Sequence, residues 1–129
     1  MKIVPLLGRV LFGLIFLMSG LTHITGAGAD HAAAAGVPVA GILVPFAGLL
    51  SLLGALSILL GYKVKYGAWL IVIFLVPVTI ALHNFWAVKD PMQLQMQMAM
   101  FMKNVAILGG ALLFAYFGTG PYSLDNRKA

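Results

Sequence analysis

Four long apolar runs, at about residues 3–22, 37–60, 66–85 and 92–117, limit how this chain can fold more than any other feature. A helix that crosses a bilayer needs about 20 mostly apolar residues, and each run reaches that length. Spanning segments must satisfy their backbone N–H and C=O groups internally, which leaves helices or closed β-barrels. Barrel strands alternate apolar and polar residues over about 10 positions, and these runs do not. The sequence therefore predicts an all-α membrane protein, a four-transmembrane-helix antiparallel bundle with one domain over residues 1–129.

Composition and charge agree with a lipid environment. Of the 129 residues, 62% are hydrophobic and 9% are charged, whereas soluble domains carry about 25% charged residues. The formal net charge is +5, but the cations gather near the ends of the runs, which favours anionic lipid over nucleic acid as the partner. The chain has no cysteine, which excludes thiolate chemistry and cysteine-ligated iron–sulfur clusters.

The connections between the runs are short, so four spans place both termini on one side. Segment 24–36 is a Gly/Ala-rich loop, 61–65 is a tight turn, and Asp90 and Pro91 suit the cap and first turn of the last helix. Five cations then share the side of the termini, against one on the other side: Lys2, Lys63, Lys65, Arg127 and Lys128, against Lys89. The positive-inside rule predicts a multi-pass protein of the bacterial inner membrane with both termini cytoplasmic.

One alternative changes the number of spans. Residues 1–29 resemble a secretory signal, with Lys2, an apolar run and a small-residue site at Ala27-Gly28-Ala29. Cleavage there would leave three helices. Arg9 interrupts the apolar run, which favours four spans.

Two cations lie inside the runs, where a charge at the helix centre costs about 2.5–3.5 kcal/mol. Arg9 lies on a helical stripe with Gly13, Phe16, Gly20 and His23 and either extends to the headgroups or serves a site. Lys103 lies next to a stripe of Gln93, Gln97, Met100 and Asn104 in the last run. This stripe is either a polar seam between helices or part of a ligand or proton site.

Histidines close the first and third runs on the same side of the membrane. His23, His83, Gln97, Lys103 and Asn104 are expected to converge in the outer half of the bundle. The candidate ligand-binding residues are His23, His83, Asn84, Trp86, Gln97, Lys103 and Asn104. No metal site is expected, because no His-x3-His pairing is present, and the five methionines of segment 92–102 are interpreted as apolar packing.

The chain resembles the DoxX family of small four-helix membrane proteins over Pro5 to Tyr122. The matching motifs are Gly8-Arg9, Ser19-Gly20-Leu21, His83-Asn84-Phe85-Trp86 and Lys103-Asn104-Val105-Ala106-Ile107-Leu108-Gly109-Gly110. Members are similar to a small subunit of a thiosulfate:quinone oxidoreductase or to membrane partners in oxidative-stress complexes. Many relatives carry Lys where this chain has His23, so a role that depends on charge does not transfer to this position.

The resemblance implies an accessory or non-catalytic subunit of a membrane redox system, quinone-linked or associated with oxidative stress. A quinone is the possible cofactor, held in a polar pocket in the outer leaflet, and a redox protein or a second copy of the chain are possible partners. One alternative is a ligand-free scaffold, with Gly41, Gly48 and Ala55 or Gly109-Gly110 as partner surfaces. A less favoured alternative is a small-molecule transporter with Arg9 and Lys103 as anion ligands.

Overall fold

The computed structural model describes residues 1–128 and confirms the all-α prediction. Four helices are long and apolar enough to cross a membrane. They are α1 (Ile3–His23), α3 (Ala40–Leu60), α4 (Val64–Leu82) and α5 (Pro91–Phe117). The short helix α2 (Ala29–Ala34) and the 3-10 helices η1 (Phe85–Ala87) and η2 (Asp125–Lys128) complete the described part.

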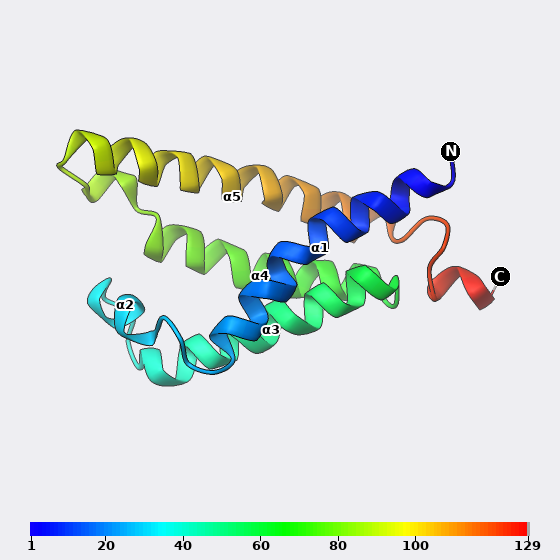
Figure 1. Ribbon diagram of the computed structural model, residues 1–129, viewed down its shortest axis with the longest axis horizontal. Helices are drawn as coiled ribbons and strands as arrows, with labels where there is room; N and C mark the ends of the chain where they lie inside the picture. The colour runs from blue at the N-terminus through cyan, green and yellow to red at the C-terminus, as the bar shows by residue number, and fades with distance from the viewer. Residues whose placement is uncertain (129) are drawn as a thin grey trace.

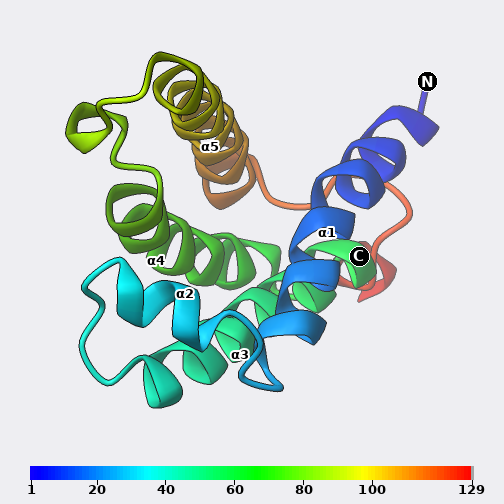
Figure 2. The same ribbon diagram turned by 60° about the vertical axis from the view of Figure 1, so that its left-hand side comes forward.

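Both termini lie at one end of the bundle, beside the turn between α3 and α4 (Figure 1). We call this the terminal end, and the opposite end, which carries α2 and η1, the loop end. Along the bundle, α1 packs on α3, α3 on α4 and α4 on α5, so that the long helices form a curved row (Figure 2). Phe12 of α1 meets Phe114 of α5 with ring centroids 5.0 Å apart, which brings the two outer helices of the row into contact.

Small residues allow the backbones of α1 and α3 to approach each other closely. A Cβ atom added at Gly20 would lie 2.7 Å from the backbone nitrogen of Leu52, and one added at Gly48 would lie 2.5 Å from that of Ile24. Ser51 crosses the same contact and donates a hydrogen bond of 2.8 Å to the Phe16 carbonyl oxygen. Helices in lipid gain little from hydrophobic burial against each other, so close backbone approach and interhelical hydrogen bonds hold them together.

The helix boundaries depart from the expected runs at the loop end. Segment 24–36, expected to be a loop, contains α2, whose Ala32 is buried, and α3 begins at Ala40 instead of 37. Helix α4 ends at Leu82, because the next residue has non-helical dihedral angles (φ −121°, ψ 39°). At the other boundary the prediction is confirmed: the Asp90 carboxylate accepts a hydrogen bond of 3.0 Å from the Gln93 amide.

The start of α4 depends on a distant part of the chain. The amides of Lys63 and Val64 donate to the two carboxylate oxygens of Asp125, at 2.9 and 3.4 Å. This side-chain cap satisfies two of the four orphan amides at the helix N-terminus. The helix therefore begins at Val64, two residues before the apolar run that predicted it.

Candidate functional site

Arg9 is enclosed at the terminal end of the bundle. Its side chain is fully buried, and its Nη2 donates to the backbone carbonyl oxygens of Tyr122 and Pro121. Its Nη1 lies against Gly61, where any added Cβ atom would overlap it. The guanidinium is thus held by protein instead of extending to the headgroups, and its Nε and Nη1 have no hydrogen-bond partner in the described structure.

The Arg9 contact fixes the C-terminal segment, residues 118–126, across the turn between α3 and α4. The amides of Leu124 and Asp125 donate to the carbonyl oxygens of Leu60 and Gly61 at 3.2 and 2.9 Å. Gly61 has φ +66°, so a side chain there would be both strained and blocked. Arg9 therefore joins α1, this turn and the C-terminal segment into one unit.

Two polar pairs connect α4 and α5 at the loop end. His83 Nδ1 and Gln97 Oε1 are 2.8 Å apart, and Asn104 Nδ2 donates to Thr79 Oγ1 at 3.0 Å. The Thr79 hydroxyl in turn donates a hydrogen bond of 2.7 Å to the Leu75 carbonyl oxygen. These pairs fix the register of the two helices and form a polar seam in which His83, Gln97 and Asn104 bond to neighbouring groups.

His23 and Lys103 have partners elsewhere. His23 Nδ1 lies 2.7 Å from the Ser19 carbonyl oxygen, one turn back on α1. The Lys103 side chain is on the exposed side of α5, with its Nζ 3.6 Å from Met100 Sδ, in the direction of the loop end. Of the five side chains expected to converge, the structure joins His83 to Gln97. Asn104 bonds to Thr79, while His23 and Lys103 contact residues of their own helices.

The remaining candidate residues, Asn84 and Trp86, lie at and within η1. Phe85, Trp86 and Phe101 form an edge-to-face cluster with ring centroids 5.2–5.9 Å apart. Asn84 is half-buried, and Trp86 is exposed at the rim of this cluster. The cluster anchors the α4–α5 connection on α5, and its exposed aromatic edge suits the membrane–water interface.

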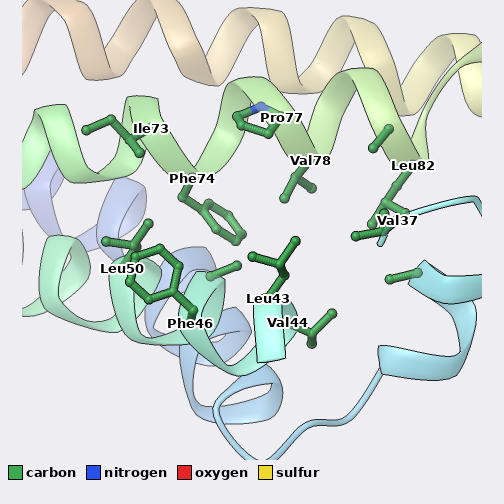
Figure 3. Close-up of a pocket in the computed structure, with 13 residues that line it drawn as sticks. Val37, Leu43, Val44, Phe46, Leu50, Ile73, Phe74, Pro77, Val78 and Leu82 are labelled. Carbon is green, nitrogen blue, oxygen red and sulfur yellow. The ribbon is translucent and has the colours of Figure 1, made fainter. Parts of the chain in front are cut away.

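An apolar cavity that sequence reasoning missed lies between α3 and α4 (Figure 3). Its volume is about 300 Å³. Phe74 and Val78 of α4 face Leu43 and Phe46 of α3 across it, and Val37 and Ala32 border its loop end. Small residues on the two facing helices, Ala47 and Ala81, leave this space, and neither stands out in so apolar a sequence.

The loop end combines a polar seam with an apolar cavity. No group of three His, Cys, Asp or Glu side chains in residues 1–128 is placed to hold a metal ion. The polar side chains of the loop end bond mainly to each other, while the cavity beside them has an entirely apolar lining. Such a cavity suits a hydrocarbon chain. The Trp86 ring and the Asn84 amide beyond its loop end suit the polar end of the same molecule.

Comparison with known proteins places this architecture in a family. The chain is 35% identical to the inner membrane protein YqjF of Escherichia coli, over 95% of this chain and 92% of that protein. It is 28% identical to YphA, a second inner membrane protein of that bacterium, over 95% of this chain and 88% of that protein. It is also 29% identical to the Surfeit locus protein 4 homolog of Schizosaccharomyces pombe, of which it covers 37%.

No solved structure matches the chain. The DoxX family model matches residues 4–84, which include α1 to α4 apart from Ile3. That match covers more than half of the sequence, and the similarity to YqjF continues through α5. The chain is therefore an integral membrane protein that belongs to the DoxX family.

Proposed function

We propose that this protein is an accessory, non-catalytic subunit of a redox system in the bacterial inner membrane, and that it binds a quinone at the loop end. The apolar cavity between α3 and α4 carries the proposal. Its size lies at the lower limit of known ligand pockets, about 300 Å³, which suits a section of an isoprenoid tail better than a whole cofactor.

The position of the cavity along the bundle sets where the quinone ring would lie. Ala81 and Leu82 line its loop end, and His83 and Asn84 follow directly in the sequence. A quinone with its tail between α3 and α4 would thus bring its ring to the depth of these two residues. The Asn84 amide is a suitable donor to a quinone carbonyl oxygen, and Trp86 offers a ring for stacking.

The proposed accessory role follows from how the polar groups are used. His83, Gln97 and Asn104 serve the contact between α4 and α5, and Arg9 serves the terminal end. These groups therefore stabilise a framework that holds a ligand, while a partner protein would supply the electron donor.

The test uses the full chain purified in mild detergent from a quinone-containing membrane. We expect quinone in the organic extract, and an Ala81→Phe variant, which fills the cavity, should lose at least about nine-tenths of it. Ala99→Phe adds the same side chain at an exposed position of α5 and should retain the quinone. Equal quinone content in the two variants, or none in the wild type, would refute the proposal.

A ligand-free scaffold is the second candidate function, supported by one exposed surface. An added Cβ atom at Gly109 on α5 would meet no atom within 4 Å, which leaves room for a helix of a partner. In the other predicted stripe, Gly48 and Ala55 are buried inside the chain, and Gly41 alone is exposed. A Gly109→Leu variant that loses a co-purifying protein but keeps its quinone content would favour the scaffold.

A further inference from the structure

A cleft at the terminal end separates the start of α4 from the end of α5, and its volume is about 340 Å³. Its lining comes from three parts of the chain: Lys63, Val64, Lys65 and Tyr66, then Phe117, Gly118 and Thr119, and finally Asp125. We propose that this cleft binds the phosphate headgroup of an anionic phospholipid. The site lies at the opposite end of the bundle from the proposed quinone site and is independent of it.

The charges of the cleft favour an anion. Two lysines line it, and the single carboxylate, that of Asp125, accepts hydrogen bonds from the Lys63 and Val64 amides. Its negative charge is therefore held at the N-terminus of α4, where the helix dipole is positive. The ammonium groups of Lys63 and Lys65, both on exposed side chains, remain available to a phosphate.

The geometry of the C-terminal segment keeps the cleft open. Gly118 has φ +81°, a conformation that lets the chain turn sharply away from the end of α5. A Cβ atom at Gly118 would lie 3.7 Å from Cε of Lys65, so the lysine side chain lies directly over this turn. Lys63 lines the same cleft, and its Nζ lies 5.5 Å from the centre of the Tyr62 ring. Both lysines therefore border the same cleft.

The surface around the cleft argues for a lipid over a free anion. Exposed Tyr66 and Phe117 line it, and two further exposed aromatic side chains, Trp69 and Tyr116, lie within one helical turn of them in the sequence. Aromatic residues of this kind gather at the level of the lipid headgroups. About one turn further along each helix, the exposed side chains of Trp69 on α4 and Leu113 on α5 are apolar. A phosphate between the lysines would therefore have its acyl chains laid along α4 and α5.

The experiment measures lipid binding to the purified full chain in mild detergent by native mass spectrometry, together with the melting temperature. Phosphatidylglycerol and phosphatidylcholine with identical acyl chains are compared, and inorganic phosphate is the third ligand. We expect bound phosphatidylglycerol and a raised melting temperature with this lipid only. A surface cation contributes about 1 kcal/mol to anionic-lipid attraction, so Lys63→Gln/Lys65→Gln should bind it at least about tenfold more weakly.

The matched control is Lys89→Gln, which removes an exposed lysine at the loop end and should leave lipid binding unchanged. Lys65→Gln alone is the second variant in case the double variant does not fold, with an expected weakening of about fivefold. Equal binding of the two lipids, or equal weakening in the control, would overturn the proposal. A melting-temperature increase of the same size with inorganic phosphate would indicate a free-anion site instead of a lipid site.

Discussion

Replacing Gly20 by alanine should separate α1 from α3. The added Cβ atom would lie 2.7 Å from the backbone nitrogen of Leu52 and 2.8 Å from its Cα. Ordinary contact begins at 3.4 Å, so the helices must move apart by about 0.7 Å, the difference between 3.4 and 2.7 Å. Backbone atoms inside a helix cannot rotate away as a side chain can. The clash must therefore be relieved by movement of whole helices.

The free-energy cost can be worked out from two opposing terms. Overpacking costs about 1–3 kcal/mol, and a clash with backbone belongs at the upper end of that range. Alanine has a higher helix propensity than glycine, which stabilises the helix by up to about 1 kcal/mol. We therefore expect Gly20→Ala to lower the free energy of unfolding by about 2 kcal/mol. Part of this loss would come from the Ser51 hydrogen bond to the Phe16 carbonyl, which crosses the same contact.

Gly8→Ala is the matched control on the same helix. A Cβ atom there would meet nothing within 4 Å, so only the propensity gain of up to about 1 kcal/mol applies. The two variants should differ by about 3 kcal/mol, a factor of about 150 in the unfolding equilibrium constant. Unfolding in mixed detergent micelles with increasing SDS, followed by tryptophan fluorescence, measures this difference. Equal stability of the two variants would show that the close approach of α1 and α3 is not as described.

Three further predictions concern other contacts. Arg9→Leu should release the C-terminal segment and speed its hydrogen exchange, while Arg9→Lys should release it less; unchanged exchange in both variants would contradict the role of the guanidinium. A double-mutant cycle with Thr79→Val and Asn104→Leu should give a coupling free energy of about 0.6 kcal/mol, and up to about 1.7, in the same SDS assay. Additive effects would mean that this hydrogen bond does not stabilise the fold. Single cysteines at Lys2 and Asn126, in a chain without native cysteine, should be labelled only from the cytoplasmic side, and labelling from opposite sides would exclude four spans.

The sequence by itself determined the number of long apolar helices and their approximate bounds. Length and hydropathy are local properties, and a bilayer selects for about 20 apolar residues whatever the neighbouring helices do. The Asp90 cap was predictable for the same reason, since the carboxylate and the Gln93 amide it accepts from are three residues apart. The Ala29–Ala34 helix was missed because a six-residue helix has no such local signal and depends on burial of Ala32.

Only the tertiary structure decided how the polar residues are used. A helical stripe shows that Gln97 and Asn104 share a face, but their partners, His83 and Thr79, are set by the register between α4 and α5. Lys103, one position before Asn104, points to the exposed side because adjacent residues on a helix face different directions. Hydropathy fixes which segments enter the bilayer, whereas contacts between residues far apart in the sequence fix which faces meet there.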